Sequence, residues 1–255
     1  MILMSPGAEA FQIFGLSVYW YGIIMAFAIL VGTFVADWAY KKRGGGELIL
    51  DRMPWLVLVG FAGARVYYCV LNWHYYISRP LSVLNVREGG LSIHGTLLAC
   101  LIFLFFYARK KDIKLFDLTA PMTLGLALAQ SIGRWGNFFN SEAFGKPIET
   151  GMIKLFIPET LRPLQYKSSE YFHPAFLYES VLDFGIFLIL LWAFRKNRNS
   201  LFITSLYFAL YAIARILVES IRIDSIFNIA GIPVAIFVSV LILIAALFGI
   251  SKSRA

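Results

Sequence analysis

A stripe of charged and phenolic side chains runs along one predicted helix near the C-terminal end, in the segment YAIARILVESIR. Tyr211, Arg215, Glu219 and Arg222 follow one another at helical spacing. This spacing keeps all four within about 80° of one another around the helix axis, so they share one face. Arg215 and Glu219 are placed to form an ion pair, which is one reading of the stripe. The second arginine leaves a surplus positive charge, which favours the binding of an anion.

A second group of polar side chains lies in residues 133–142, GRWGNFFNSE, at the end of an apolar segment. Glycines near Arg134 loosen the predicted helix and let a ligand approach the backbone, where a guanidinium can bind a phosphate through two parallel hydrogen bonds. Asn137 and Asn140 can donate to phosphate or hydroxyl oxygens. Glu142 can hold Arg134 in place or accept a hydrogen bond from a ligand hydroxyl. The alternative is a polar loop with an interfacial arginine.

Two further polar groups lie in other apolar segments. His94 opens one of them in the sequence GLSIHGTL. Histidine suits proton transfer near neutral pH, but a lone histidine on an apolar helix can also be a packing residue. Arg65, Tyr68 and Asn72 share one face of another segment. They are either part of a site or a packing seam with one arginine.

Three more side chains complete the set of candidates. Tyr21, in the motif Trp-Tyr-Gly, supplies a phenol near the start of the chain. Glu179 and Asp183 lie one turn apart on a buried helix that opens with HPAFLYES. An ionisable side chain at membrane depth is costly unless it is paired or hydrated, so each such residue marks a candidate site.

The elements that must position these side chains are membrane-spanning helices. The chain has 255 residues, of which 59% are hydrophobic and 15% charged, whereas soluble domains carry about 25% charged residues. Runs of roughly 20 apolar residues match the thickness of a bilayer core. The sequence therefore predicts an all-α integral membrane protein, a bundle of seven transmembrane helices. The runs cover approximately residues 16–38, 54–72, 91–108, 115–133, 174–194, 201–219 and 231–250.

The basic residues predict the orientation of this bundle. Of the 23 Lys and Arg residues, 13 follow alternate spans. The opposite short segments, residues 1–15 and 73–90, contain only Arg79 and Arg87. By the positive-inside rule, the N-terminus is outside and the C-terminus is cytoplasmic. The 13 residues are Lys41, Lys42, Arg43, Arg52, Arg109, Lys110, Lys111, Lys114, Arg195, Lys196, Arg198, Lys252 and Arg254.

The remaining features predict one domain over residues 1–255, with an outer-face loop at about 134–173. A loop of this length is usually a lid or a binding element. The net charge of +8 reports orientation and attraction to membrane lipid, so no nucleic-acid partner is expected. Cys69 and Cys100 lie within apolar spans and are expected to be inert. No set of side chains has the spacing of metal ligands, so neither a metal nor a cofactor is expected.

The motifs together resemble those of the prolipoprotein diacylglyceryl transferase family. The family signature G-R-x-G-N-F-x-N-x-E matches residues 133–142 at every specified position. Other family landmarks follow in order: Trp-Tyr-Gly at 20–22, His-Gly at His94, H-P-x-x-L-Y-E at 173–179, and Y-x3-R-x3-E-x2-R at 211–222. The resemblance therefore covers almost the whole chain, and the family has seven spans with the N-terminus outside.

The resemblance implies a reaction and a place for it. Phosphatidylglycerol would donate its diacylglyceryl group to the lipobox cysteine of a preprolipoprotein, just after the apolar part of the signal peptide. A thioether would form and glycerol 1-phosphate would leave, in the first step of bacterial lipoprotein maturation. The enzyme would be a multi-pass protein of the bacterial cytoplasmic (inner) membrane with its site toward the outer face. The alternative from another class is a lipid or anion transporter with an arginine-lined site.

The resemblance also implies roles for individual side chains. Arg134 would grip the phosphate of the donor, and Arg215 would stabilise the leaving phosphate with Tyr211 beside it. The thiol would be activated by His94, or else His94 would position the substrate while Arg215 lowers the thiol pKa. Thr96 stands where the family commonly has a second glycine after this histidine. The residues expected to assist Arg134 are Asn137, Asn140 and Glu142, and those expected to line or brace the site are Tyr21, Tyr68, Glu179, Glu219 and Arg222.

Overall fold

The computed structural model describes residues 1–46, 49–85, 89–223, 228–229 and 232–253. Arg87 and Arg254, two of the basic residues used to predict the orientation, lie outside the described residues. Within the described part of the chain, seven helices are long and apolar enough to cross a membrane. This confirms the prediction of an all-α membrane protein with seven spans. The helices are α1 (Trp20–Lys42), α2 (Ile49–Leu71), α4 (Ile93–Lys110), α5 (Leu115–Asn140), α6 (Ala175–Arg195), α7 (Ser200–Glu219) and α8 (Val234–Lys252).

Several expected span boundaries differ from the helices. Helix α2 begins at Ile49 instead of near residue 54, and two other differences lie in the first and fourth spans. Residues 16–19 form strand β3 (Leu16–Tyr19), which pairs with β2 (Glu9–Ile13) in a hairpin, and α1 starts only at Trp20. Helix α5 does not loosen at its glycines but continues to Asn140, so the loop expected from residue 134 begins at Ser141. Packing explains the difference in α5: a Cβ on Gly136 would come within 2.8 Å of the Tyr21 ring. This close contact with α1 outweighs the cost of about 1 kcal/mol for a glycine within a helix.

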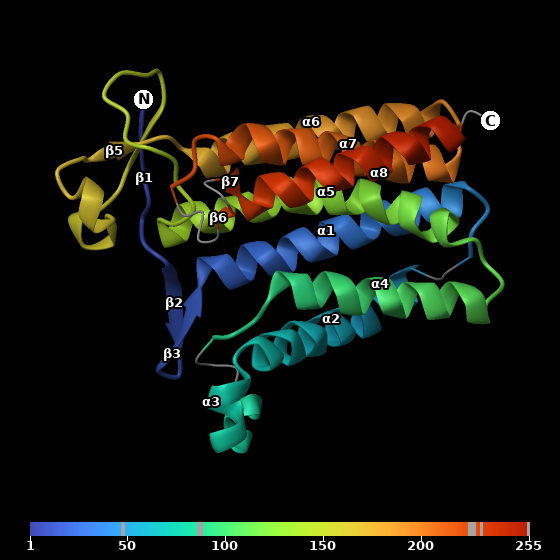
Figure 1. Ribbon diagram of the computed structural model, residues 1–255, viewed down its shortest axis with the longest axis horizontal. Helices are drawn as coiled ribbons and strands as arrows, with labels where there is room; N and C mark the ends of the chain where they lie inside the picture. The colour runs from blue at the N-terminus through green and yellow to red at the C-terminus, as the bar shows by residue number, and fades with distance from the viewer. Residues whose placement is uncertain (47–48, 86–88, 224–227, 230–231, 254–255) are drawn as a thin grey trace. The chain divides into compact units, whose positions relative to one another are not determined.

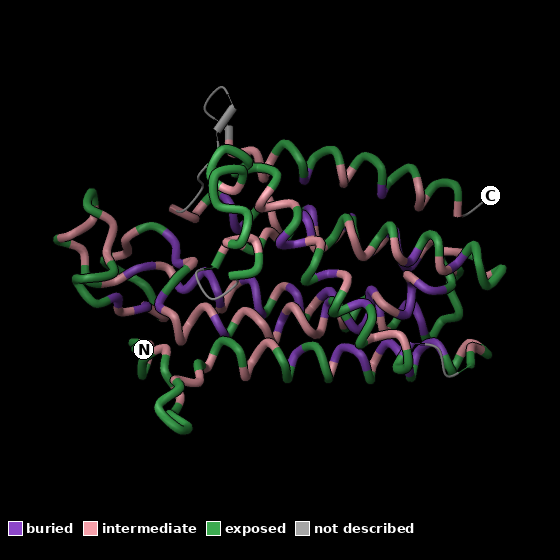
Figure 2. Tube along the Cα trace, turned by 90° about the horizontal axis from the view of Figure 1, so that it is seen from below, coloured by how far each residue is buried: buried purple, intermediate pink, exposed green. Residues whose placement is uncertain are grey.

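The chain divides into two compact units, residues 1–36 with 120–255, and residues 37–119. In the first unit, α7 packs against both α6 and α8, and Figure 1 shows these three helices side by side. Helices α1 and α5 approach closely at two glycines, since a Cβ on Gly32 would lie 2.7 Å from the carbonyl oxygen of Gly125. Helix α8 is coloured as exposed over most of its length in Figure 2. An apolar helix with so little burial suits contact with lipid.

The first unit also carries a small cap made from the N-terminus and the segment between α5 and α6. Strand β1 (Ile2–Met4) pairs in parallel with β4 (Lys154–Phe156), and β4 pairs antiparallel with β5 (Tyr171–Phe172). Two short 3-10 helices, η3 (Glu159–Leu161) and η4 (Leu164–Tyr166), lie between these strands. A buried core holds the cap together. Its residues are Phe144, Leu155, Ile157, Phe172 and Phe176.

The second unit centres on the packing of α2 against α4. A Cβ on Gly63 would lie 2.7 Å from the carbonyl oxygen of Gly95, and a Cβ on Gly60 would lie 3.1 Å from Cys100 Sγ. Small residues therefore let the two helices approach closely, as in other membrane helix pairs. The short helix α3 (Trp73–Ser78) and the 3-10 helix η1 (Pro80–Leu84) follow α2.

Candidate functional site

Six charged side chains gather in the first unit, near the end of α5, the start of α6 and the end of α7. Helix α5 contributes one arginine and α6 two carboxylates; α7 contributes an arginine and a carboxylate, and the segment after α7 the third arginine. Five ion pairs join these six residues. We call these residues the arginine cluster. They are Arg134, Glu179, Asp183, Arg215, Glu219 and Arg222.

Glu179 lies at the centre of the arginine cluster. Its Oε2 is 2.7 Å from Nη1 of Arg134, and its Oε1 is 2.9 Å from Nη1 of Arg222 and 3.4 Å from Nη1 of Arg215. One carboxylate thus joins three guanidinium groups from two helices and the segment after α7. Because three like charges so close together repel one another, the carboxylate is what allows them to share one place.

Two further carboxylates complete the pairing. Glu219 Oε2 is 2.7 Å from Nη2 of Arg215, the ion pair predicted from their spacing on one helix. Asp183 Oδ2 is 3.6 Å from Nε of Arg134, which is too long for a hydrogen bond and leaves only electrostatic attraction. Three arginines therefore meet three carboxylates. The surplus positive charge inferred from α7 alone is not present, because α6 supplies Glu179 and Asp183.

The arginines and the carboxylates differ in exposure. The side chains of Arg134 and Arg215 are 23% and 22% exposed, whereas the Glu179 side chain is 6% exposed. The two arginines are therefore partly exposed, and the carboxylate that joins them is buried. One shared cavity of about 10 Å³ is lined by Arg134, Arg215 and Tyr211, and also by Glu179 and Asp183. A cavity of this size is comparable to one water molecule, so a phosphate group has to bind at the exposed part of the arginines or displace a carboxylate.

Hydrogen bonds between helices fix the register of the arginine cluster. Ser131 Oγ donates to the carbonyl oxygen of Ser180, and Ser180 Oγ donates to that of Ser131, both at 2.8 Å. These two residues lie one turn before Arg134 and next to Glu179. The pair therefore sets how α5 and α6 meet. This contact was not predictable, because two single serines in apolar helices give no signal of their reciprocal contact.

A buried tyrosine lies next to the arginine cluster. The Tyr207 hydroxyl donates to Oε1 of Gln130 at 2.9 Å, and the Tyr207 ring stacks on that of Tyr211 with centroids 5.9 Å apart. Tyr207 is 3% exposed. This contact joins α7 to α5 and holds Tyr211 against the cavity, so Tyr207 and Gln130 are positioning residues that the sequence did not single out as a pair.

The polar residues at the end of α5 form a neighbouring group. Asn140 Nδ2 donates to Oε1 of Glu142 at 3.2 Å, and the backbone N–H of Glu142 donates to the carbonyl oxygen of Asn137. Glu142 therefore does not hold Arg134, which is one of the two roles expected for it; Glu179 and Asp183 do so instead. The Tyr21 ring packs over Gly136, between these residues and Arg134 along α5.

The cap is attached to the end of α7 beside Arg222. Arg222 forms an antiparallel bridge with Gly145, and the backbone N–H of Lys146 donates to the carbonyl oxygen of Ile221 at 2.8 Å. The backbone N–H of Gly145 also donates to the carbonyl oxygen of His173, in the same segment between α5 and α6. The folded segment between α5 and α6 thus positions the backbone of one cluster arginine.

Two of the predicted site residues, His94 and Tyr68, belong to the second unit. His94 lies in the first turn of α4, is exposed, and has its ring centroid 6.2 Å from that of Tyr67. Tyr68 stacks edge-on with Tyr76 at 6.4 Å, and Asn72 Nδ2 donates to the carbonyl oxygen of Tyr68. The catalytic role of His94 and the binding role of Tyr68 stay predictions.

Arg65, also in the second unit, has a structural role. Its guanidinium donates five hydrogen bonds of 2.7 to 3.0 Å, all to backbone carbonyl oxygens in η1 or between η1 and α4. It also lies over the Tyr76 ring at 5.3 Å. Every N–H of the guanidinium is therefore used within the protein. Of the two readings of the sequence, the structure favours the packing role. The accepting residues are Ser82, Val83, Asn85, Gly89 and Gly90.

Comparison with known proteins gives consistent matches along the chain. A family model described as prolipoprotein diacylglyceryl transferase matches residues 8–251. A phosphatidylglycerol–prolipoprotein diacylglyceryl transferase of Synechococcus sp. (strain CC9902) is 42% identical over 228 residues, covering 87% of this chain and 81% of the relative. The protein of the same name from Synechococcus elongatus is 40% identical over 253 residues, covering 96% and 86%. That of Synechocystis sp. is 38% identical, covering 96% and 89%.

Proposed function

The chain belongs to the prolipoprotein diacylglyceryl transferase family, and we propose that it transfers the diacylglyceryl group of phosphatidylglycerol to the lipobox cysteine of a prolipoprotein. The observation that supports this site assignment most directly is that Arg134 of the family signature and Arg215 line one cavity. Family membership favours the transferase over the transporter alternative. The whole chain acts as one catalytic unit in this proposal, and no cofactor takes part.

The reaction is a displacement at carbon. The cysteine sulfur attacks the diacylglyceryl carbon that carries the phosphate, and a carbon–sulfur bond forms as the carbon–oxygen bond to phosphate breaks. The bonding electrons leave with the phosphate oxygen, so the products are a thioether and glycerol 1-phosphate. The thiol proton passes to a base. The leaving group changes from a phosphodiester monoanion to a monoester that is largely dianionic at neutral pH, so negative charge develops on it.

The arginine cluster supplies the counter-charge for this leaving group. Arg134 and Arg215 line the shared cavity and are partly exposed, and Glu179, which also lines it, pairs with both. A guanidinium that is already oriented costs no reorganisation when charge develops, which is where electrostatic catalysis is most effective. Arg134 binds the donor's phosphate, and Arg215 stabilises the leaving phosphate with Tyr211 beside it.

The remaining predicted residues have supporting roles in this proposal. Asn137 and Asn140 lie within two turns of Arg134 along α5, and Glu142 follows the end of this helix; the three bind the glycerol head group, together with Tyr21. Glu219 and Arg222 brace the cluster through Arg215 and Glu179. His94 stays the predicted acceptor of the thiol proton, and Tyr68 stays a predicted binding residue.

The proposed location is the bacterial cytoplasmic membrane, with the site toward its outer face. The basic residues at the opposite end of the spans support this orientation through the positive-inside rule. A lipobox cysteine at the outer end of a signal-peptide helix would then reach the same level as the arginine cluster. Both substrates are held in the bilayer, so each enters the site from the lipid phase.

The direct test is a reconstituted transfer reaction. Purified protein, phosphatidylglycerol and a lipobox peptide should give a peptide whose mass has increased by one diacylglyceryl group, together with glycerol phosphate. Arg134→Lys keeps the charge that pairs with Glu179 but loses the planar fork, so it should remain folded and lose most of the transfer activity. Arg195→Lys, the same change at an exposed arginine outside the cluster, is the control. An active Arg134→Ala variant would overturn the role of Arg134, and lipid flux without a thioether product would overturn the proposed function.

A further inference from the structure

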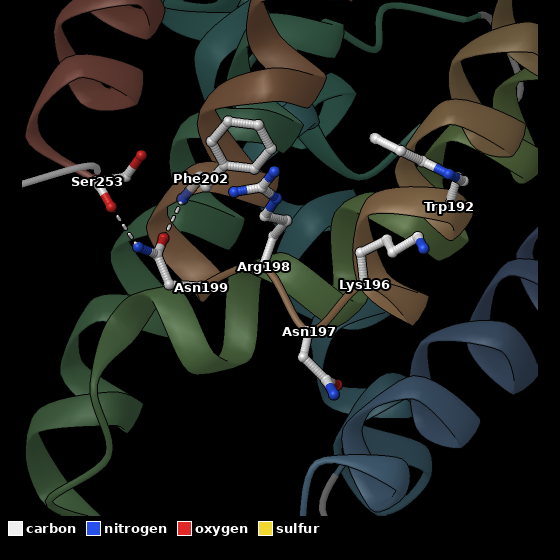
Figure 3. Close-up of a pocket in the computed structure, with 7 residues that line it drawn as sticks. All are labelled: Trp192, Lys196, Asn197, Arg198, Asn199, Phe202 and Ser253. Atoms are coloured by element: carbon white, nitrogen blue, oxygen red, sulfur yellow. Dashed lines mark hydrogen bonds between the residues drawn. The ribbon is translucent and has the colours of Figure 1, made fainter.

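A second cavity lies at the other end of the helices that carry the arginine cluster. It has a volume of about 800 Å³ and is shown in Figure 3. It opens where α6 ends, α7 begins and α8 ends. Lys196, the C-cap of α6, follows Glu179 by 17 residues. At 1.5 Å per residue, this places the second cavity about 25 Å from Glu179 of the arginine cluster. Its lining residues are Trp192, Lys196, Asn197, Arg198, Asn199, Phe202 and Ser253.

Hydrogen bonds fix the backbone of this turn. Asn197 has a positive φ of 53°, and its N–H donates to the carbonyl oxygen of Phe194, while the N–H of Arg198 donates to that of Ala193. This pattern ends α6 in a Schellman turn and satisfies its last carbonyl groups. The turn is therefore a defined structure that fixes the backbone from which the side chains of 196–198 extend.

Asn199 ties the turn to the two neighbouring helices. Its Oδ1 accepts from the N–H of Phe202 at 2.7 Å, which caps α7, and its Nδ2 donates to the carbonyl oxygen of Ser253 at 2.7 Å. Figure 3 shows both bonds on one side of the cavity, with Lys196 and Trp192 on the other. Three span ends are thus joined around the opening.

The described lining holds basic side chains and neither Asp nor Glu, in contrast to the arginine cluster. Its two basic residues are Lys196 and Arg198. The sequence contains no Asp or Glu from residue 184 to 218 or from 234 to 255, so α7 up to Val218 and all of α8 contribute none. The Arg198 guanidinium lies over the Phe202 ring at 5.6 Å, and the Lys196 ammonium has no hydrogen bond or ion pair to any residue that the structure describes. The lining therefore favours an anion.

The depth of the cavity indicates where that anion comes from. Its residues lie at the ends of three apolar spans, the level at which head groups meet water. Trp192 is 57% exposed, and tryptophan is typical of this interface. The cavity volume is within the range of about 300–1,000 Å³ that small-molecule sites occupy. A lipid phosphate lies at this depth, and its acyl chains continue along the exposed apolar face of the spans.

We propose that the cavity at Lys196 and Arg198 binds the phosphate of an anionic phospholipid, at the end of the bundle that the positive-inside rule assigns to the cytoplasm. This site is separate from the arginine cluster and does not take part in the transfer reaction. Inorganic phosphate presents the same chemical group to these side chains as the phospholipid does. The two ligands are distinguished by whether binding requires a lipid.

Native mass spectrometry of the full chain in mild detergent tests the proposal by counting retained lipids. The test variant is Lys196→Gln with Arg198→Gln, and the matched control is Arg195→Gln with Lys252→Gln. The control loses the same two charges at the same end but does not change the cavity lining. Wild type and control should retain one more phosphatidylglycerol than the test variant, whose affinity for this lipid should be on the order of 30-fold weaker. Phosphatidylcholine should show no such difference.

Several results would overturn the proposal. Equal phosphatidylglycerol retention by all three proteins would show that Lys196 and Arg198 do not form a lipid site. Lys196-dependent binding of inorganic phosphate without lipid retention would exclude the lipid as its source. Transfer activity in detergent checks the fold of the test variant, because neither changed residue belongs to the reaction site. If that activity is lost, Lys196→Arg with Arg198→Lys must restore both activity and lipid retention, and its failure would also count against the proposal.

Discussion

Replacement of Glu179 by glutamine tests whether one carboxylate holds the arginine cluster together. The change removes a negative charge that lies 2.7, 2.9 and 3.4 Å from three guanidinium nitrogens and is 6% exposed. Each pair at about 3 Å has an attraction of roughly 5 kcal/mol at an effective dielectric constant of 20, and desolvation offsets much of it. Loss of one partner of a buried ion pair typically costs about 3–5 kcal/mol.

The expected result is a large fall in the thermal midpoint of the purified protein in detergent. A loss of about 3–5 kcal/mol corresponds to roughly 10 °C for a chain of this size, at about 2–4 °C per kcal/mol. Asp183→Asn removes a single partner at 3.6 Å and should lower the midpoint by only a few degrees. Glu170→Gln, at an exposed position of the cap, is the control and should leave the midpoint unchanged.

Added phosphate separates this mechanism from a general loss of packing. Without the carboxylate, three arginines repel one another, so inorganic phosphate should raise the midpoint of Glu179→Gln more than that of the wild type. The transfer rate should fall at least tenfold, because Arg134 and Arg215 lose their common brace. A Glu179→Gln protein with the midpoint of the Glu170→Gln control would refute the reasoning, and so would a destabilised variant that phosphate does not rescue.

Three further substitutions test the elements that support the site. Arg65→Lys replaces five donors by three, so at least two backbone carbonyl groups lose their partner, and the thermal midpoint should fall by several degrees; an unchanged midpoint would show that the five hydrogen bonds are dispensable. Gly136→Ala places a Cβ 2.8 Å from the Tyr21 ring, so the thermal midpoint and the transfer activity should both fall. If the clash is the cause, Tyr21→Ala in the same chain should restore the thermal midpoint. Tyr207→Phe removes the hydrogen bond to Gln130 and should cost about 1 kcal/mol, with a coupling of similar size in a double-mutant cycle with Gln130→Ala; additive effects would contradict the contact.

The membrane spans were predictable because bilayer thickness sets their length, whereas the helix ends were not. Apolar character marks where the chain meets hydrocarbon, but a helix continues as long as its backbone is satisfied and packed. Helix α5 therefore runs through Arg134 to Asn140, beyond the apolar run. Residues 16–19 are apolar enough to extend the first run, yet they pair with β2. The parallel pairing of β1 with β4 joins residues 2–4 to 154–156, and no local pattern indicates such a distant partner.

All six members of the arginine cluster were candidates from the sequence, but their partners were not predictable. Helical spacing correctly paired Arg215 with Glu219, because both lie on one helix. Glu179 was a candidate as well, but its contacts with three arginines depend on how α5, α6 and α7 meet. Counting charges on α7 alone therefore gave a surplus that α6 cancels. Arg65 was ambiguous for a related reason: its partners are backbone carbonyl groups, which every residue has.

A charge-balanced arginine cluster suits the proposed reaction better than a purely cationic pocket. Phosphatidylglycerol is both donor substrate and a lipid of the surrounding bilayer, so strong binding of its monoanionic phosphate would hold the ground state without lowering the barrier. The carboxylates behind the arginines reduce that binding. During the reaction, additional negative charge develops on the leaving phosphate beside Arg134 and Arg215, while the charges of Glu179 and Glu219 do not change. The interaction therefore strengthens as the carbon–oxygen bond breaks, which is the condition for an electrostatic site to accelerate the chemical step.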